Sequence, residues 1–214
     1  MVISFSKVSM DPRLRHPFNM ICSGISGAGK TEFVKKLIRF RDQMIDHPPE
    51  RIVWCYGQWQ DGYNDLTKEG VEFRPGLKLD NIDASKNNLL IIDDLMCETT
   101  EIVKDWFTKK GHHTSTSIIY VVQDMFHKSK HHRTISLNSH YMVIFKNPRD
   151  RSQIDHLARQ VYPGYVKFMR KAYEDATSKA YGYLFCDFKP ETIDELRLRT
   201  DIFPNEVNYV YCKA

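Results

Sequence analysis

The residues of this chain that are best suited to chemistry lie in the run GISGAGKT, at positions 24–31. The run matches the pattern G-x-x-x-x-G-K-[ST] at each fixed position. Glycines let successive backbone N–H groups turn inward and come close to phosphate oxygens. A helix that begins at such a loop adds its unpaired N–H groups and the positive end of its dipole. We therefore expect a phosphate-binding loop formed by Gly24, Ser26, Gly27, Ala28, Gly29, Lys30 and Thr31.

Lys30 and Thr31 have distinct expected roles in this loop. The lysine would neutralise the β- and γ-phosphates of ATP, and the threonine hydroxyl would bind Mg²⁺. The alternative is a short pattern that arises by chance in a turn. Here, however, the loop follows the apolar run 17–23 and precedes residues 31–45, where apolar side chains recur at helical spacing. A strand, a loop and a helix in that order favour nucleotide binding.

Two carboxylates stand where a second apolar run ends, in LLIIDD at residues 89–94. Asp93 would hold Mg²⁺ through water, and Asp94 would polarise or orient the attacking water as a catalytic base. The alternative interpretation is a pair of ordinary loop carboxylates after a strand. Many P-loop motor proteins carry Asp-Glu at these two positions. Asp94 is one methylene shorter than a glutamate, so its carboxylate reaches less far.

Gln123 ends the apolar run 117–123. Its amide can donate to a γ-phosphate oxygen and accept from the attacking water, so that it would respond to the nucleotide present. Taken alone, Gln123 is more simply interpreted as a polar residue that begins a loop, and it gains its functional interpretation only together with the other motifs.

Three arginines follow Gln123 in the chain, at positions expected on the same edge of the sheet: Arg133, Arg149 and Arg151. An arginine from a neighbouring subunit can stabilise the charge that develops during phosphoryl transfer. Such an arginine finger would couple hydrolysis to assembly in a ring. The sequence does not choose among the three. Each one alone is more simply a surface or ion-pairing arginine, and we expect one finger among them.

The elements that must position these residues alternate along the chain. Strands are expected at 17–23, 51–57, 88–93, 117–123, 140–147 and 180–188. Helices are expected at 31–45, 99–110, 149–162 and 165–177. Gly111 is expected to end the helix at 99–110. The polar stretch 58–87 indicates loops or weak elements. This order predicts a three-layer α/β fold with a mainly parallel central sheet.

Chain length is consistent with one domain over residues 1–214, with an N-terminal extension at 1–16 and a C-terminal tail at 189–214. The tail mixes charged and aromatic residues, and it could pack on its own core or reach a neighbouring subunit.

Composition excludes several classes of protein. Apolar residues make up 42% of the chain and charged residues 27%, as in a globular protein rather than a disordered one. No apolar run reaches the roughly 18 residues of a membrane span, and the N-terminus lacks the layout of a secretory signal. Five scattered cysteines without a CxxC pair favour buried free thiols in a reducing compartment.

Positive charge is concentrated in one segment. Residues 104–133 hold six Lys or Arg and two Asp, a net charge of +4 that equals that of the whole chain. A solvated basic face is the simpler interpretation, and nucleic-acid contact is the functional one. The histidine pairs 112–113 and 131–132 lie in this segment, but they lack the Cys/His spacing of a zinc finger.

Several segments in order resemble the viral genome-packaging ATPases of the FtsK–HerA superfamily, in the branch of poxvirus-type viruses, virophages and Maverick/Polinton-like elements. The similarity covers roughly residues 15–190 and rests on GISGAGKT, LLIIDDLM, GHHTSTSIIYVVQDMF, RTISLNSHYMVIFKNPRDRSQIDHLARQVYP and YGYLFCDF. It implies a RecA-like additional-strand (ASCE) P-loop ATPase core, with the glutamine strand between the two motif strands.

By this resemblance, Lys30 and Thr31 match the Walker A pair, Asp93 and Asp94 the Walker B acids, and Gln123 the sensor glutamine. The arginine finger does not carry over to one position.

The resemblance also implies partners and cofactors. ATP and Mg²⁺ would be bound, and a homo-oligomeric ring, hexameric or pentameric, would translocate double-stranded DNA into a preformed capsid. Capsid or portal-vertex proteins are the further expected partners, without membrane insertion. The location would be an infected host cell, in the nucleus or a cytoplasmic virus factory, or the virion. Basic loops would line the ring and contact DNA phosphates, with Lys128, Lys130 and Arg133 as the preferred contacts.

Two other functions remain open from the sequence. A P-loop nucleotide kinase would need an arginine-rich lid and a pocket for the acceptor base, whereas Gln123 and the paired acids favour a motor. A nucleotide-switched capsid-assembly scaffold with weak turnover would keep the same fold and the same loop.

Overall fold

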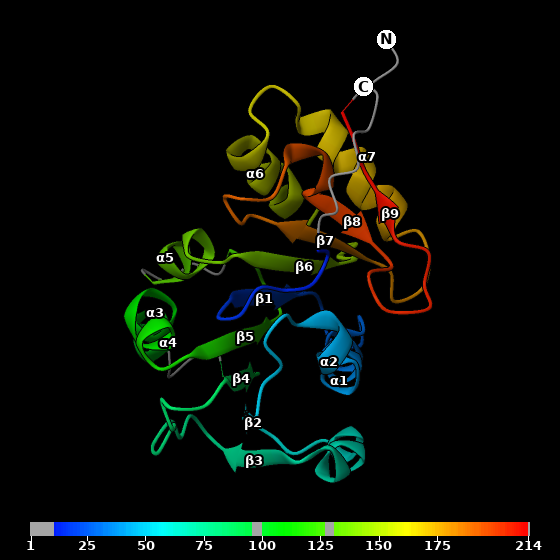
Figure 1. The fold of residues 1–214 in the computed structure, drawn as a ribbon. Coiled ribbons are helices and arrows are strands. Elements are labelled where there is room, and N and C mark those ends of the chain that lie inside the picture. The colour runs from blue at the N-terminus through cyan, green and yellow to red at the C-terminus, as the bar shows by residue number, and fades with distance from the viewer. Residues whose placement is uncertain (1–10, 96–99, 127–130, 214) are drawn as a thin grey trace.

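The centre of the molecule is a twisted sheet (Figure 1). In the computed structural model, which describes residues 11–95, 100–126 and 131–213, nine strands lie in the order β3-β2-β4-β5-β1-β6-β7-β8-β9. Their bounds are β1 Asn19–Ser23, β2 Arg51–Tyr56, β3 Val71–Pro75, β4 Asn88–Asp93, β5 Thr116–Val122, β6 Tyr141–Phe145, β7 Tyr183–Asp187, β8 Leu198–Thr200 and β9 Tyr209–Val210.

The sheet has a parallel part and an antiparallel part. All pairs from β3 to β6 are parallel, whereas β7, β8 and β9 add antiparallel strands at one edge. The predicted α/β fold with a mainly parallel central sheet is therefore confirmed. β5, which precedes Gln123, lies between β1 and β4, in the place that the resemblance implies for the glutamine strand.

Helices cover both faces of the sheet, and Figure 1 shows α1 and α2 on one side with α3, α4 and α5 on the other. The first face carries α1 Lys30–Arg39, α2 Arg41–Met44 and the 3₁₀ helix η1 Asp61–Glu69. The second carries α3 Thr100–Asp105, the π-helical turn η2 Trp106–Lys110, α4 Gly111–His113, α5 His132–Leu137, α6 Ser152–Val161 and α7 Val166–Ala176. A short 3₁₀ turn, η3, spans Asp194–Leu196.

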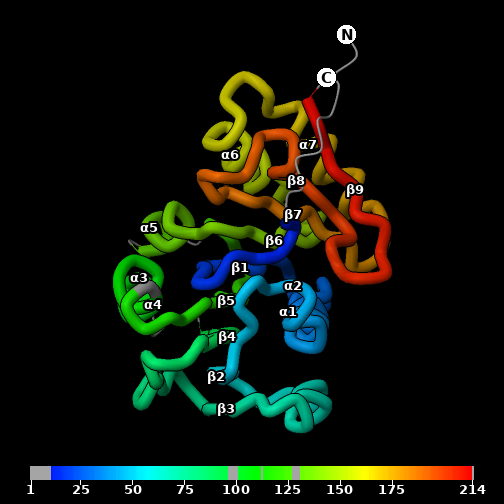
Figure 2. The backbone as a smooth tube through the Cα atoms, viewed as in Figure 1, coloured from blue at the N-terminus to red at the C-terminus, as the bar shows by residue number. Residues whose placement is uncertain are grey.

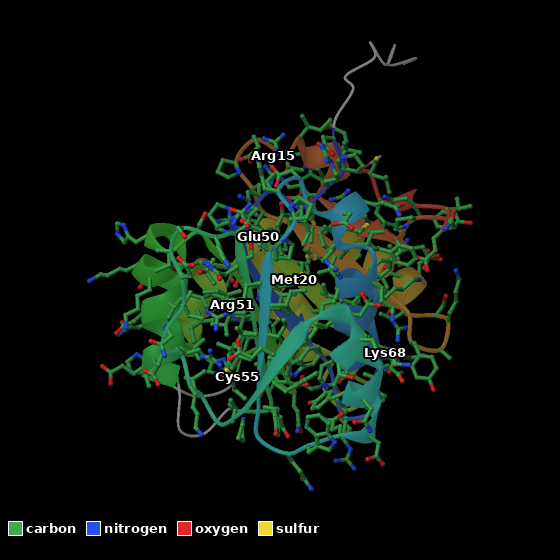
Figure 3. All side chains as sticks on the ribbon, turned by 60° about the horizontal axis from the view of Figure 1, so that its bottom comes forward. Arg15, Met20, Glu50, Arg51, Cys55 and Lys68 are labelled. Atoms are coloured by element: carbon green, nitrogen blue, oxygen red, sulfur yellow. The ribbon has the colours of Figure 1, made fainter. Side chains whose placement is uncertain are left out.

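The two layers explain why the middle of β4 is a continuous apolar run. In β4, Leu90 and Ile92 pack in the cluster that contains α3, whereas Leu89 and Ile91 pack in the cluster that contains α1. Successive side chains of a strand point to opposite faces, so a sheet covered on both faces buries them all. Figure 3 shows the side chains on the ribbon, with the partly buried Arg51 and the buried Cys55 along β2 and the exposed Lys68 on η1.

The stretch 58–87 contains more regular structure than the sequence predicts. Tyr63 and Leu66 of η1 are buried, and Val71 begins β3, which pairs with β2 at the far edge of the sheet. The apolar residues of this stretch are widely spaced among polar ones, so no periodic pattern marks either element.

Two helix boundaries also differ from the prediction. The helix expected over 31–45 is interrupted at Phe40, which takes non-helical dihedral angles between α1 and α2. Gly111 does not end its helix: it has ordinary helical angles, and the helical run continues to His113. A Cβ at Gly111 would come within 3.0 Å of the Trp106 carbonyl oxygen and 3.2 Å of Ile118, so close packing accounts for this glycine.

The segment expected as a C-terminal tail packs on its own core. Leu198 of β8 is fully buried and Phe203 is 4% exposed, and β9 pairs with β8. Figure 2 shows the orange and red end of the chain lying along the edge of the sheet beyond β6. The sheet is therefore completed by residues that follow the segment of family resemblance.

Three of the cysteines expected as buried thiols, Cys22, Cys55 and Cys186, are free and buried. Cys212 is also free but exposed, and Cys97 lies outside the described residues. Among helices of the described ranges, none has the length and apolar character required to cross a membrane.

We expect Leu198→Ala to lower the free energy of unfolding by about 2–5 kcal/mol, because it leaves a cavity in the core. Urea unfolding followed by circular dichroism measures the change. Leu137→Ala is the matched control, since Leu137 is 65% exposed on α5 and its removal should change stability by less than about 0.5 kcal/mol. Equal effects of the two substitutions would contradict the packing of the C-terminal segment in the core.

Candidate active site

The carboxyl ends of three parallel strands meet at one edge of the sheet. Val122 of β5 aligns with Ser23 of β1, and Val121 aligns with Asp93 of β4. Ligands of open α/β sheets bind at this edge. A cavity of about 330 Å³ opens there, lined by Ser26, Gly27, Gly29, Lys30, Thr31, Glu32, Gln60, Asp93, Asp94, Val121, Val122, Gln123 and Tyr181.

The loop 24–31 follows β1 and curves around this cavity. Gly27 and Gly29 have φ values of 76° and 107°, left-handed angles that a residue with a side chain rarely adopts. Gly29 caps α1, and its carbonyl accepts from the Phe33 N–H at 2.9 Å. Gly24 and Ala28 do not line the cavity: Gly24 packs on Phe145, and the Ala28 N–H donates to the Ile25 carbonyl. These two residues shape the loop.

Lys30 extends along the inside of the loop. Its ammonium donates to the carbonyl oxygens of Gly24 at 2.5 Å and Ile25 at 2.9 Å. Because both acceptors are neutral, the positive charge remains for an anion in the cavity. Burial lowers the pKa of Lys30, while the nearby Cys22 and Asp93 act in the opposite direction.

Asp93 is the last residue of β4 and is 4% exposed. The Tyr63 hydroxyl donates to its Oδ2 at 2.8 Å, which connects η1 to the carboxylate. Burial raises the pKa of Asp93, whereas the hydrogen bond from Tyr63 and the charge of Lys30 lower it. Burial also raises the pKa of Tyr63, so the phenol remains a hydrogen-bond donor. The carboxylate is thus held in one orientation at the cavity wall.

Asp94 and Gln123 approach each other at the open side of the cavity. The Gln123 Nε2 donates to Asp94 Oδ1 at 3.4 Å, and both side chains are exposed. Asp94 has a left-handed φ of 55°, which aspartate tolerates better than most residues. This turn directs the second carboxylate away from β4, which ends at the buried Asp93. An acid and an amide therefore stand side by side at the cavity.

The three arginines lie outside the cavity. Arg133 is exposed on α5, and Arg149 and Arg151 are exposed around the turn before α6. Arg151 makes a long ion pair with Glu174 at 3.9 Å. Within the described residues that line the cavity, none is an arginine.

The turn between β6 and α6 is nevertheless close to the site. The Asn147 N–H donates to the Tyr173 hydroxyl at 2.9 Å, and Asn147 and Asp150 line a small pocket together with Gly24 and Gln123. Arg149 and Arg151 flank Asp150 in sequence, so they lie at the same sheet edge as the cavity.

Part of the basic segment 104–133 lies away from the cavity. Lys109 and Lys110 are exposed on η2, where the Asn19 side chain donates to the Phe107 carbonyl. Asn19 begins β1, so this contact lies toward the sheet edge opposite the cavity. Lys128 and Lys130, two expected DNA contacts, lie outside the described residues.

Sequence reasoning missed four side chains at the site: Glu32, Gln60, Tyr63 and Tyr181. Glu32 directly follows the loop, so its position in sequence could have identified it. Gln60 and Tyr63 lie in the polar stretch 58–87, and Tyr181 precedes β7, and their roles depend on tertiary contacts that no local pattern encodes.

The oxygen donors at the site fit Mg²⁺. Thr31 offers a hydroxyl and Asp93 a carboxylate, both hard ligands, at the wall of the same cavity. The described residues contain no group of three or more His, Cys, Asp or Glu arranged to hold a metal by themselves. Mg²⁺ is usually bound by one or two carboxylates together with substrate phosphates, so this sparse set suits it.

Comparison with known proteins supports the fold. No family model matches the chain, and no curated protein matches it in sequence. Among solved structures, it resembles the genome-packaging NTPase B204 of Sulfolobus turreted icosahedral virus 2 in complex with ATP-gammaS, with a TM-score of 0.53 and 14% identity over 86% of this chain and 97% of that one. The flagellar accessory protein FlaH of Methanocaldococcus jannaschii matches at a TM-score of 0.41 and 14% identity, over 63% of this chain and 75% of that one. The chain has the α/β fold of RecA-like P-loop ATPases.

We expect Asp93→Asn to raise the melting temperature of the nucleotide-free chain at neutral pH. The pKa of Asp93 is raised by burial above 3.8, so its ionised form is less stable in the folded chain than in the unfolded one. The folded carboxyl takes up a proton as the pH falls through its raised pKa, and the difference between the two chains should then shrink. Thermal unfolding at neutral pH and at mildly acidic pH measures both effects.

Asp94→Asn is the control for this experiment, because it changes an exposed carboxylate next to the buried one. A lower melting temperature for Asp93→Asn at neutral pH, or a difference that does not change with pH, would contradict the expected burial of the charge.

Proposed function

We propose that this chain is a Mg²⁺-dependent ATPase that uses hydrolysis to move double-stranded DNA into a viral capsid. One observation carries the ATPase part of the proposal: Lys30, Asp93, Asp94 and Gln123 come from three strand ends and converge on one cavity. The structural likeness to a genome-packaging NTPase supports the packaging part.

In this proposal the chain binds and orients the triphosphate. Backbone N–H groups of the loop and the start of α1 hold the phosphates, and Lys30 neutralises the β- and γ-phosphates. Thr31 and Asp93 hold Mg²⁺, which neutralises charge on the bridged phosphate oxygens. Tyr63 fixes the orientation of Asp93 through its hydrogen bond.

The Asp94–Gln123 pair acts on the attacking water. Asp94 accepts a proton from that water, and the Gln123 amide orients it against the γ-phosphate. The contact between the two side chains keeps the base and the orienting amide on the same side of the phosphate. The pair suits hydrolysis, in which water is the acceptor of the phosphoryl group.

An arginine from a neighbouring copy completes the site. Arg133, Arg149 and Arg151 are the candidates, and the absence of arginine from the described cavity lining supports a finger supplied in trans. The assembly would be a homo-oligomeric ring, hexameric or pentameric, in which each site is complete only at a subunit boundary.

The remaining partners follow from the packaging role. Lys128, Lys130 and Arg133 would contact phosphates of the double-stranded DNA in the ring, without reading bases. Capsid or portal-vertex proteins would hold the ring at the capsid, in an infected host cell or in the virion. A nucleotide kinase and a nucleotide-switched assembly scaffold are the alternatives that the experiment must separate.

The decisive experiment measures phosphate release from ATP with and without double-stranded DNA. We expect Lys30→Ala to weaken MgATP binding roughly 10- to 100-fold, because a charge-assisted contact is lost. Asp94→Asn should bind MgATP but hydrolyse it roughly 10²- to 10⁴-fold more slowly. Lys68→Ala, on the exposed surface of η1, is the control and should leave both quantities unchanged.

Stimulation by DNA without a phosphorylated nucleotide product supports the motor. Phosphate transfer to a nucleotide would establish a kinase instead, and genome packaging that survives Asp94→Asn would favour the scaffold.

Mixing variants tests the finger. We expect Arg133→Ala, Arg149→Ala or Arg151→Ala, whichever removes the finger, to abolish turnover while MgATP still binds. Mixing that variant with Asp94→Asn subunits should restore some activity, because a boundary between the two then has an intact base on one side and an intact arginine on the other. Turnover that is lost in the variant and never restored by mixing would contradict action in trans.

A further inference from the structure

A second cavity lies directly beside the first. Its volume is about 260 Å³, and it shares Gly29, Glu32 and Tyr181 with the cavity of about 330 Å³ described above. Three segments enclose it: the first turns of α1, the turn 179–183 before β7, and residues 201–206 after β8. The shared residues make the two cavities neighbours on either side of Tyr181.

Tyr181 stands at the boundary between the cavities, with 71% of its surface exposed. Its φ of 61° is left-handed, a conformation that is unfavourable for a bulky residue. The ring lies against the phosphate loop: a Cβ built on Gly29 would be 3.3 Å from both Cβ and Cδ1 of Tyr181. A large aromatic face is thus held open to solvent beside the loop.

The turn that carries Tyr181 is tightly fixed. The Gly182 N–H donates to the Lys179 carbonyl at 3.2 Å, and a side chain at Gly182 would collide with the carbonyl of Ala176 at the end of α7. Tyr183, two residues on, is buried in β7 and packs edge-on against Phe33. The backbone on both sides of Tyr181 is therefore anchored to the core, which sets the position of the ring.

The second cavity has aromatic walls and a rim of paired charges. Phe203 packs on Phe33 with ring centroids 5.0 Å apart, and the Lys36 ammonium lies 4.5 Å above the Phe203 ring. Lys36 also pairs with Glu206, and Lys179 pairs with Asp201 at 2.9 Å.

These charges disfavour another phosphate. The rim holds three carboxylates, Glu32, Asp201 and Glu206, against two ammonium groups, and both of the latter already have partners. Flat aromatic surface with a polar rim suits a neutral heterocycle that can stack and also form hydrogen bonds at its edge.

We propose that the second cavity binds the base of the nucleotide, with the Tyr181 ring stacked on a purine. This inference rests on the proposed function, because it takes the triphosphate to lie in the first cavity. Base–aromatic stacking depends on overlap area, so a purine is preferred to a pyrimidine. Residues 201–206, beyond the family resemblance, then form part of the nucleotide site.

The test compares MgATP with inorganic tripolyphosphate in the presence of Mg²⁺, by isothermal titration of the full chain. Tripolyphosphate reports the phosphate site alone, because it has no base. Tyr181→Asn removes the ring but keeps a residue that tolerates left-handed angles, so the turn is preserved. We expect it to weaken MgATP binding roughly 5- to 100-fold and to leave tripolyphosphate binding unchanged.

Two further variants sharpen the result. Tyr181→Phe keeps the stacking face and should bind MgATP as the native chain does. Tyr165→Asn is the matched control, since Tyr165 is also an exposed tyrosine, 54% accessible, and lies away from both cavities. The native chain should bind MgATP more tightly than MgCTP, and Tyr181→Asn should lose that preference.

The outcomes separate this inference from the proposed function. Tripolyphosphate binding by the native chain, with MgATP affinity unchanged in Tyr181→Asn, would overturn the base site and leave the phosphate site in place. Equal weakening of both ligands in Tyr181→Asn would overturn stacking, since the residue would then act through the loop. If the native chain binds neither ligand, the proposed function fails, and the base site fails with it.

Discussion

The aligned parallel pairing of β1, β4 and β5 is the constraint on which the rest of the structure depends. Their last residues, Ser23, Asp93 and Val122, reach the sheet edge at nearly the same level, because hydrogen bonding fixes the register of each pair. A shift of one residue would turn every side chain of a strand to the other face. The phosphate loop, the two acids and the glutamine each directly follow or end one of these strands, so the site is a consequence of register.

At that sheet edge, several residues have a burial or a backbone conformation that lowers the stability of the folded chain. Asp93 has a buried carboxyl group that can ionise. Lys30 is partly buried, and its ammonium donates hydrogen bonds to neutral carbonyl oxygens. Asp94 has a left-handed backbone conformation. Tyr63 satisfies one carboxylate oxygen and limits the penalty of burying Asp93. Buried charges and unfavourable backbone angles of this kind are typical of functional sites, where a bound ligand supplies compensating contacts.

The parts of the site that could be predicted from sequence are those encoded locally. The loop 24–31 is recognisable because glycine, lysine and threonine occupy fixed positions, and Asp93 and Gln123 because each ends a continuous apolar run. Tyr63 and Tyr181 were missed because their roles arise only when η1 and the turn before β7 fold against the sheet. Gly111 was wrongly expected to end a helix, because glycine serves close packing as well as left-handed turns. The proposed finger remains a choice among three arginines, since a contact between subunits would leave no pattern within one chain.

The position of β1 in the middle of the sheet has a consequence for the order in which the chain folds. The phosphate loop is synthesised early, yet its strand pairs with residues far along the chain, as Asn19 does with Ile118 and Met20 with Tyr141. Closing such long loops costs conformational entropy before any pairing is gained, and non-local parallel contacts form slowly. Pairing on both sides of β1 therefore depends on β5 and β6, which lie far along the chain. In the proposed function, a nucleotide that needs all three strand ends would bind only the chain in which these strands are paired, so its binding would stabilise that non-local pairing.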